Sequence, residues 1–325
     1  MPSPTSETKL WLTATGSIAA VVLLEIYRRQ RRESKYAVPA NLRSSPFAKE
    51  LRVAIALARQ AGGNMVGYCD EKGTELESNH DLGIETKGQA EDFCTKIDVE
   101  NERLVTEGLL RHFPDHKIIG EETVGQGEIP PLTTDPTWII DPIDGTTNFA
   151  SGIPLTCVSI GMCLDRIPTV GVVYVPVTQE LYLAVKGYGA YRNGVRLGKR
   201  SDKKLLESVV CFEFGYARAA SEVTQMVCAV ERILQHGCRT ARSLGSGVLD
   251  LLYVATGRLD VVYAGVASEG WKPWDYCAAS VVALETGCVI ERIDGGTAFD
   301  IYSDTMICGV GKGLVDEIRE KINGK

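Results

Sequence analysis

One stretch near the middle of the chain, from Trp138 to Phe149, limits the possible folds more than any other; it reads WIIDPIDGTTNF. Residues 138–140 are apolar and favour β-structure, so we expect a buried strand that ends at Asp141-Pro142. Asp144-Gly145 is typical of a turn, and the threonines that follow favour the start of a helix. The stretch therefore predicts two carboxylates at a strand end, next to free backbone N–H groups. Such an arrangement suits divalent cations held against a phosphate.

Two other segments also place an acidic residue beside a predicted element. Residues 118–123 read IIGEET, a strand followed by Glu121, and residues 274–287 begin with Trp274-Asp275 and continue as an apolar helix. Taken alone, Glu121 is explained as an exposed turn residue and Asp275 as a helix N-cap. Their occurrence together favours a metal site, because clustered carboxylates without a cation repel one another.

Together the three segments resemble the inositol monophosphatase family of magnesium-dependent, lithium-sensitive phosphatases. The family's Gly-Glu-Glu, Trp-x-x-Asp-Pro-x-Asp-Gly-Thr-x-Asn-Phe and Trp-Asp segments occur here in the same order, and the middle one matches at every fixed position. The resemblance runs from about residue 47 to the C-terminus. It implies a layered α-β-α-β-α sandwich, a homodimer, and hydrolysis of a small phosphomonoester by a metal-activated water without a phosphoenzyme.

The resemblance also implies metal ligands. The first metal would be held by Glu121, Asp141 and the backbone carbonyl of Ile143, and the second by Asp141, Asp144 and Asp275. These acids, Asp98 and a substrate dianion carry seven negative charges, so two magnesium ions leave three and three ions leave one. We therefore expect two firmly bound Mg²⁺ ions and a third that arrives with substrate, beside Glu121 and Asp98.

Catalytic and phosphate-binding roles are implied in the same way. Thr146, paired with Asp98, would orient and deprotonate the attacking water. Asp144, Thr147 and the N–H groups of Gly145 and Thr146 would face the phosphate. Taken alone, Asp98 is most simply the N-cap of the helix after it; Lys87, Thr95 and Asp98 also match the family's Lys, loop, Thr-x-x-Asp segment.

Substrate choice is less constrained by the sequence. The small-residue loop Gly245-Ser246-Gly247 is similar to the loop that family members use for inositol phosphate. Before Trp274, however, Ser268 takes the position of the family's Glu, and Glu269 falls one residue later. Inositol monophosphate is the first expectation. Histidinol phosphate or a sugar phosphate is the enzymatic alternative, and a non-catalytic protein that binds phosphorylated ligands is the alternative from another class.

Composition excludes several other kinds of protein. The 325 residues carry a net charge of −7, which argues against a basic surface for nucleic acid. The ten cysteines lie mostly in apolar runs, without a Cys-x-x-Cys pair, and there are four histidines. Zinc and iron–sulfur sites therefore have little support, and buried free thiols in a reducing compartment are favoured.

The N-terminal part differs from the rest. Residues 10–24 are uncharged and mostly apolar, and five Lys or Arg residues follow within 28–35. We predict a short membrane anchor over residues 10–27 with the catalytic part in the cytosol. An organellar presequence and a tail that never inserts are the alternatives. Residues 1–45 would be anchor and basic linker, and residues 46–325 the phosphatase domain.

Within that domain the pattern predicts two halves, 46–200 and 201–325. The first should open with a helix over residues 47–65 and continue, from residue 155, as antiparallel strands with a hairpin at 192–194. In the second half, strands and helices alternate, which predicts layered α and β elements.

Overall fold

The computed structural model describes residues 35–74, 82–87, 92–268, 270–296 and 299–324. The chain divides into two compact units, residues 1–37 and residues 38–325. The helices, strands and site described below belong to the second unit. The predicted membrane segment, residues 10–27, and Glu269 lie outside the described residues. Among the residues that are described, no helix is long and apolar enough to cross a membrane.

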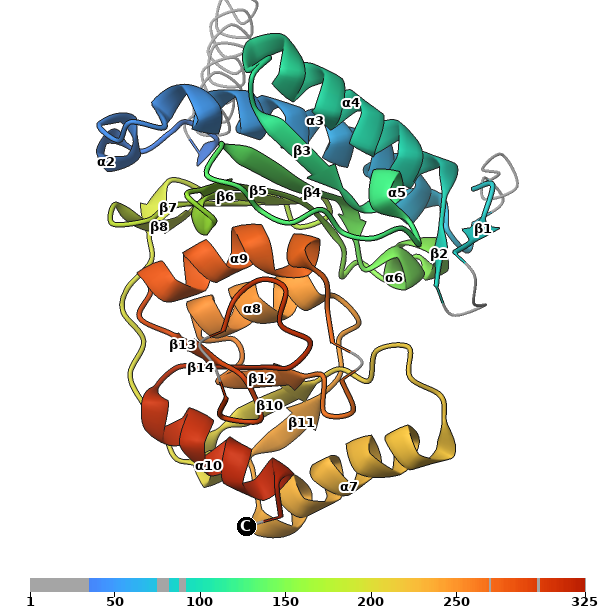
Figure 1. The fold of residues 1–325 in the computed structure, drawn as a ribbon, viewed down its shortest axis with the longest axis vertical. Helices are drawn as coiled ribbons and strands as arrows, with labels where there is room; N and C mark the ends of the chain where they lie inside the picture. Colours follow the sequence, from blue (N-terminus) through green and yellow to red (C-terminus); the bar gives the residue numbers. More distant parts are fainter. Residues whose placement is uncertain (1–34, 75–81, 88–91, 269, 297–298, 325) are drawn as a thin grey trace, which may run out of the picture. The chain divides into compact units, whose positions relative to one another are not determined.

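The elements of the second unit form five layers, as Figure 1 shows. Helices α3 (Ala48–Glu71) and α4 (Lys96–His112) cover one face of a seven-stranded sheet. Helices α8 (Gly247–Thr256) and α9 (Pro273–Glu285) lie between that sheet and a five-stranded sheet. Helices α7 (Ala220–His236) and α10 (Lys312–Ile322) cover the far side of the second sheet. The predicted α-β-α-β-α sandwich is therefore confirmed.

The seven-stranded sheet follows the chain in the order β3 to β9. Only the β3–β4 pair is parallel, and all other neighbours are antiparallel. Its strands are β3 (Lys117–Gly120), β4 (Thr137–Asp144), β5 (Cys157–Leu164), β6 (Ile167–Val175), β7 (Glu180–Val185), β8 (Gly189–Arg192) and β9 (Val195–Arg196).

The five-stranded sheet is mixed, in the order β11-β10-β12-β14-β13. Its strands are β10 (Val209–Phe212), β11 (Thr240–Arg242), β12 (Val261–Ala264), β13 (Val289–Glu291) and β14 (Met306–Gly309). Strand β10 pairs in parallel with both β11 and β12, while β14 is antiparallel to its neighbours.

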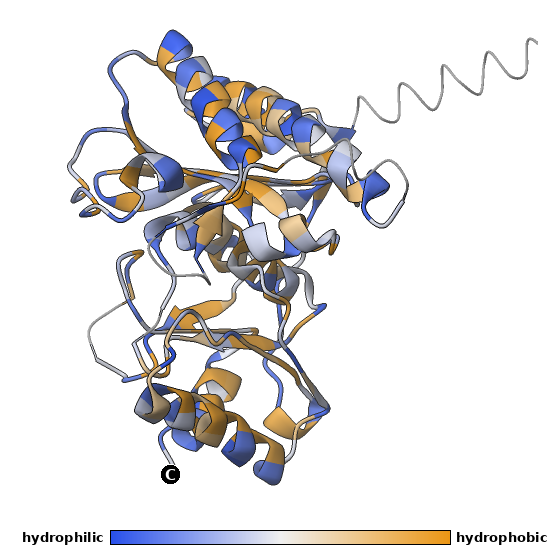
Figure 2. Cartoon of the chain, turned by 90° about the vertical axis from the view of Figure 1, so that its right-hand side faces the viewer, coloured by the Kyte–Doolittle hydropathy of each residue, from blue (hydrophilic) through white to orange (hydrophobic). Residues whose placement is uncertain are grey.

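The remaining elements are short or lie at the edges of the layers. They are α2 (Ala40–Arg43), the β1 (Glu85–Thr86) and β2 (Phe93–Cys94) pair, α5 (Glu121–Val124), α6 (Thr146–Ser151), the 3₁₀ turn at Leu205–Glu207, α7 (Ala220–His236) and α10 (Lys312–Ile322). In Figure 2 the strands of both sheets are mainly hydrophobic, whereas the outer helices alternate between hydrophobic and hydrophilic residues. Outer helices of this kind bury one face only.

Several predicted boundaries are wrong, and the reasons are local. Strand β4 does not end at Asp141-Pro142 but runs on to Asp144. Its register with β5 shifts between Asp141 and Asp144, and such an irregularity accommodates a proline that cannot donate to the ladder. Helix α3 extends six residues beyond the predicted end at Met65, to Glu71.

Helix α9 is the central element of the fold and carries Asp275 in its first turn. It packs directly against β5 and β6, where two glycines face it. A Cβ at Gly161 would lie 2.4 Å from the sulfur of Cys277, and one at Gly171 would lie 2.3 Å from the carbonyl oxygen of Ala278. Only glycine permits this approach. The close packing brings the first turn of α9 to the end of β4.

Candidate active site

A cavity of about 980 Å³ opens where β4, α6, the 244–247 loop and the N-terminus of α9 meet. Most of the predicted site residues line it: Lys87, Glu121, Asp141, Ile143, Asp144, Gly145, Thr146, Thr147, Gly245, Ser246, Gly247, Ser268 and Asp275. Asp98 does not line the cavity, because it is fully buried behind Thr146. The structure therefore brings together residues that lie up to 188 positions apart, Lys87 and Asp275 being the extremes.

Three carboxylates form the innermost part of this cavity. Oxygen atoms of Asp141, Asp144 and Asp275 lie within 4.8 Å of one another. Burial raises the pKa of Asp141 well above its usual value, and the charges of Glu121 and Asp144 raise it further. Burial and the charge of Asp144 likewise raise the pKa of Asp275. The pKa of Asp144 is raised by burial to about 6, against hydrogen bonds led by that from Ser246.

Local backbone geometry fixes two of these acids. The Asp141 carboxylate accepts the N–H of Ile143 at 3.0 Å, within the irregular end of β4. Asp275 is not the N-cap of α9 but its third residue, and its carboxylate accepts the N–H of Lys272 at 2.6 Å. The hydroxyl of Ser246 donates to Asp144.

Glu121 lines the same cavity but is paired with a cation. The ammonium group of Lys87 lies 2.9 Å from Glu121 and 2.8 Å from Glu122. Burial alone would lower the pKa of Lys87, but these two carboxylates outweigh it and raise that pKa. Burial, then the charge of Glu121, raises the pKa of Glu122 to about 7.

Asp98 and Thr146 lie together next to the three-acid cluster. The Thr146 hydroxyl is 3.5 Å from the Asp98 carboxylate and 3.1 Å from the carbonyl oxygen of Ile143. Thr95, not Asp98, is the N-cap of α4; Asp98 is the third helical residue and accepts the backbone N–H of Thr95 at 2.9 Å. Burial raises the pKa of Asp98 to about 7, although the Thr95 hydrogen bonds oppose this shift.

Gly145 turns the chain from β4 into α6 with a φ of +79°, a conformation that favours glycine. The first N–H groups of a helix have no hydrogen-bond partner inside the helix. Those of α6 come directly after Asp141 and Asp144 in the chain. Asn148, one turn later, donates its amide to the carbonyl oxygens of Leu244 and Gly245 at 2.7 and 3.2 Å. Helix α6 therefore holds the small-residue loop at the edge of the cavity.

The two specificity residues predicted just before Trp274 differ in outcome. Ser268 lies exposed at the rim with a φ of +63°, and Glu269 is outside the described residues. Tyr216, Arg218 and Trp271 also line the cavity, and the sequence analysis did not single them out. No local motif marks them. Tyr216 and Arg218 come from the β10–α7 connection and Trp271 from the β12–α9 connection, and these connections meet only in the folded chain.

Glu102 on α4 is a buried residue that the sequence analysis missed. Its carboxylate accepts the N–H groups of Glu122 and Thr123 at 2.6 and 2.8 Å, and also the Thr123 hydroxyl. It is only 3% exposed. Glu102 therefore fixes the first turn of α5, which carries Glu121. The helical spacing of α4 was the only available signal, since it places Glu102 on the buried side with Val105 and Leu109.

We expect Glu102→Ala to lower the free energy of unfolding by about 3 kcal/mol, because it leaves two backbone N–H groups without their charged acceptor. Urea unfolding of the purified protein measures this. Glu107→Ala on the same helix is the control. Its ion pair with Arg103 is exposed, so its loss should cost at most about 0.5 kcal/mol. Equal stability of the two variants would contradict the role of Glu102.

The cavity fits a hard divalent cation. Within the described part of the chain, none of Asp141, Asp144 and Asp275 forms an ion pair with a lysine or arginine. Their raised pKa values show that the folded chain by itself opposes their charge. Carboxylate and carbonyl oxygens are the ligands that Mg²⁺ prefers. A bound cation would supply the missing positive charge.

Comparison with known proteins agrees with this geometry. The model of the inositol monophosphatase family matches residues 48–323. The chain belongs to this family. Inositol monophosphatase 1 of Solanum lycopersicum is 39% identical over 261 residues, which cover 80% of this chain and 90% of the tomato protein. Inositol monophosphatase 1 of Sus scrofa is 34% identical over 86% of this chain and 96% of its own length.

Solved structures of inositol monophosphatases also share the fold. That of inositol monophosphatase from Anabaena has a TM-score of 0.69 and 28% identity, covering 86% of this chain and 97% of its own. The Thermotoga maritima IMPase TM1415 has a TM-score of 0.70 and 28% identity, covering 85% and 97%. The inositol monophosphatase fold is thus shown both by sequence and by structure.

Proposed function

We propose that this chain is a magnesium-dependent phosphatase that hydrolyses inositol monophosphate to inositol and phosphate. The observation that carries the proposal is the cluster of Asp141, Asp144 and Asp275 beside the Asp98–Thr146 pair, in one cavity. Relatives at 33–39% identity over most of the chain bear the name inositol monophosphatase, which supports the same substrate.

The proposed ligands, all from residues that line the cavity, are Glu121, Asp141, Asp144, Asp275 and the carbonyl of Ile143. When bound, magnesium neutralises the phosphate charge, lowers the pKa of a coordinated water and stabilises the leaving oxygen. We propose two firmly bound ions and a third that accompanies substrate, from the charge balance of the five acids. The carbonyl of Ile143 already accepts the Thr146 hydroxyl, so metal binding and the threonine position are linked.

The remaining residues position the reactants. Asp98 and Thr146 would hold and deprotonate the attacking water, since the threonine hydroxyl lies between the buried carboxylate and the cavity. The N–H groups at the start of α6 would hold the phosphate oxygens. Lys87 would keep Glu121 oriented.

A phosphate-release assay tests this function. Inositol 1-phosphate, histidinol phosphate, a hexose phosphate and glycerol 2-phosphate are compared with and without magnesium. The proposal predicts magnesium-dependent release with the highest kcat/KM for inositol 1-phosphate. A higher value for histidinol phosphate or a sugar phosphate would support the enzymatic alternative. No release from any substrate, with tight binding of a phosphorylated ligand, would support a non-catalytic protein.

We also propose that residues 10–27 attach the protein to a membrane with the catalytic domain in the cytosol, and that the domain forms homodimers. The support is the uncharged run before a cluster of basic residues, and the family resemblance. Alkaline extraction of membranes compares the full chain with a variant lacking residues 1–35. If the full chain enters the soluble fraction as the shortened variant does, the proposal that residues 10–27 anchor the protein is contradicted. Light scattering of the shortened variant gives the oligomeric state.

A further inference from the structure

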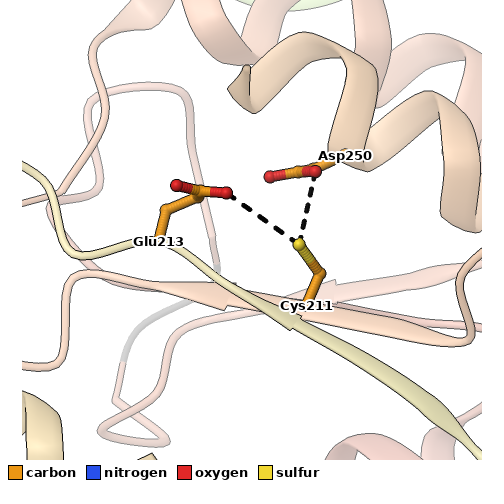
Figure 3. Close-up of side chains that lie close together, drawn as sticks. All are labelled: Cys211, Glu213 and Asp250. Atoms are coloured by element: carbon orange, nitrogen blue, oxygen red, sulfur yellow. Dashed lines mark hydrogen bonds between the residues drawn. The ribbon is translucent and has the colours of Figure 1, made fainter. Parts of the chain in front are cut away.

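A second group of acidic and thiol side chains lies behind the 243–247 loop, outside the metal cavity's innermost part. Cys211 lies in β10, Glu213 directly follows that strand, and Asp250 comes from α8 (Figure 3). The Cys211 sulfur is 3.4 Å from Asp250 and 4.0 Å from Glu213. Cys211 and Asp250 are fully buried, whereas Glu213 reaches the cavity wall.

Glu213 holds the loop through consecutive backbone amides. One of its oxygens accepts the N–H of Leu244 at 2.7 Å and the N–H of Gly245 at 2.9 Å, and the other accepts the Ser243 hydroxyl at 3.2 Å. The carbonyls of Leu244 and Gly245 accept from Asn148 on the other side. The loop backbone is thus fixed from two directions, by side chains of two different layers.

The next residue connects this loop to the metal ligands. Ser246 is the N-cap of α8 and accepts the N–H of Leu249 at 3.4 Å, while its hydroxyl donates to Asp144. Ser246 is 2% exposed, so water cannot easily replace it. Any shift of Leu244 and Gly245 therefore moves the hydroxyl that orients Asp144.

Asp250 on α8 completes the cluster. One of its oxygens accepts from Cys211, and the other is buried without a hydrogen-bond partner among the described residues. Burial, then the charge of Glu213, raises the pKa of Asp250 well above its usual value. One carboxylate oxygen each of Asp250 and Glu213 lie within 4.8 Å of one another and of the Cys211 sulfur.

We propose that Glu213, supported by Cys211 and Asp250, is a positioning residue that sets the 243–246 loop and, through Ser246, the orientation of Asp144. This inference rests on the proposed phosphatase function. Glu213 acts through the loop rather than on the substrate. It belongs to the group of outer residues whose loss weakens a metal site although they touch neither metal nor reacting atoms.

Hydrogen-exchange mass spectrometry and steady-state kinetics on the same preparations test the inference. In Glu213→Ala, exchange in the peptide that contains Leu244 and Gly245 should become about tenfold faster or more, because their acceptor is gone. The magnesium concentration for half-maximal activity should rise and kcat should fall by about tenfold, with little change in KM. Glu213→Gln keeps one acceptor oxygen and should lie between wild type and Glu213→Ala, and it serves if the alanine variant does not fold.

Asp202→Ala is the matched control. Asp202 also holds two consecutive backbone amides, those of Gly313 and Leu314 at 2.8 and 3.1 Å, but at the start of α10. It should speed exchange at residues 313–314 and leave phosphate release unchanged.

Two outcomes would overturn the inference. Wild-type exchange of the 243–246 loop in Glu213→Ala would show that Glu213 does not hold it. Faster exchange with unchanged kcat and magnesium dependence would show that the loop does not position the site. A wild-type chain that releases no phosphate from any substrate would refute the proposed function instead, and the exchange result would still report on the loop.

Discussion

Asp141→Asn should lower kcat by at least about 10³-fold. This is the upper end of the loss in kcat that follows removal of one preorganised group that stabilises charge in the transition state. Asp141 is 2% exposed, and we propose it as a ligand of both metals. The amide oxygen of asparagine can still accept the N–H of Ile143, so the local backbone should be retained. Steady-state phosphate release at saturating magnesium measures the effect.

The same variant should melt at a higher temperature than wild type when both are metal-free. Burial and four neighbouring acids oppose the Asp141 charge, and asparagine removes that opposition. We expect a rise in Tm of about 2–4 °C at pH 7.5, the shift that about 1 kcal/mol produces in a domain of this size. Asp135→Asn, an exposed acid paired with Lys117, is the control and should show neither effect. Wild-type kcat in Asp141→Asn would remove Asp141 from the mechanism.

Thr146→Val should lower kcat by about 10²–10⁴-fold, the usual contribution of a positioned general base. Valine keeps the shape of threonine but removes the hydroxyl that lies 3.5 Å from Asp98 and 3.1 Å from the carbonyl of Ile143. KM should change much less, because the backbone N–H groups of α6 remain. Kinetics with inositol 1-phosphate measures both parameters.

Thr146→Ser is the matched variant, since it restores the hydroxyl in a smaller side chain and should recover most of the activity. Circular dichroism on both variants shows whether the fold is intact. If Thr146→Val turns over like wild type, or if serine is as poor as valine, the hydroxyl does not have the proposed role.

The sequence was sufficient for the fold class and for four of the carboxylates that meet in the cavity, those of Glu121, Asp141, Asp144 and Asp275. The motif around Asp141 carried most of that information, because its strand, turn and helix start are local. The convergence of Glu121, Asp141 and Asp275 was predicted by family resemblance, and the structure places all three in one cavity. Their roles as ligands, and the division at residue 200, stay predictions.

The parts that sequence reasoning missed depend on contacts between distant segments. In the sequence, Glu102 cannot be distinguished from other polar residues of its helix. Its role becomes visible only in the folded chain, where α5 lies against it. Glu213 became recognisable only when the loop of Leu244 and Gly245 was placed on its carboxylate. The continuation of β4 through Pro142 was missed because a local rule ends a strand at proline, whereas its pairing with β5 tolerates an irregularity.

The central claim is that Glu121, Asp141, Asp144 and Asp275 form a cation site. Such a site should make the stability of the protein depend on pH in a characteristic way. Burial raises the pKa of Asp144 to about 6 and that of Asp98 to about 7 in the folded, metal-free chain, above the value near 4 in an unfolded one. The folded state therefore binds more protons. The contribution of Asp144 and Asp98 to the free energy of unfolding is fully present below about pH 4 and is lost as pH rises through about 6 to 7.

Thermal melting of the wild-type protein between pH 5 and 8, in a chelator and in saturating Mg²⁺, is the most direct test. We expect the Tm of the metal-free protein to fall as pH rises, and Mg²⁺ to raise the Tm most at the upper end of this range, where the site is ionised. Asp141→Asn, melted in parallel, should respond little to Mg²⁺. A wild-type Tm that Mg²⁺ leaves unchanged at every pH would contradict the existence of the site.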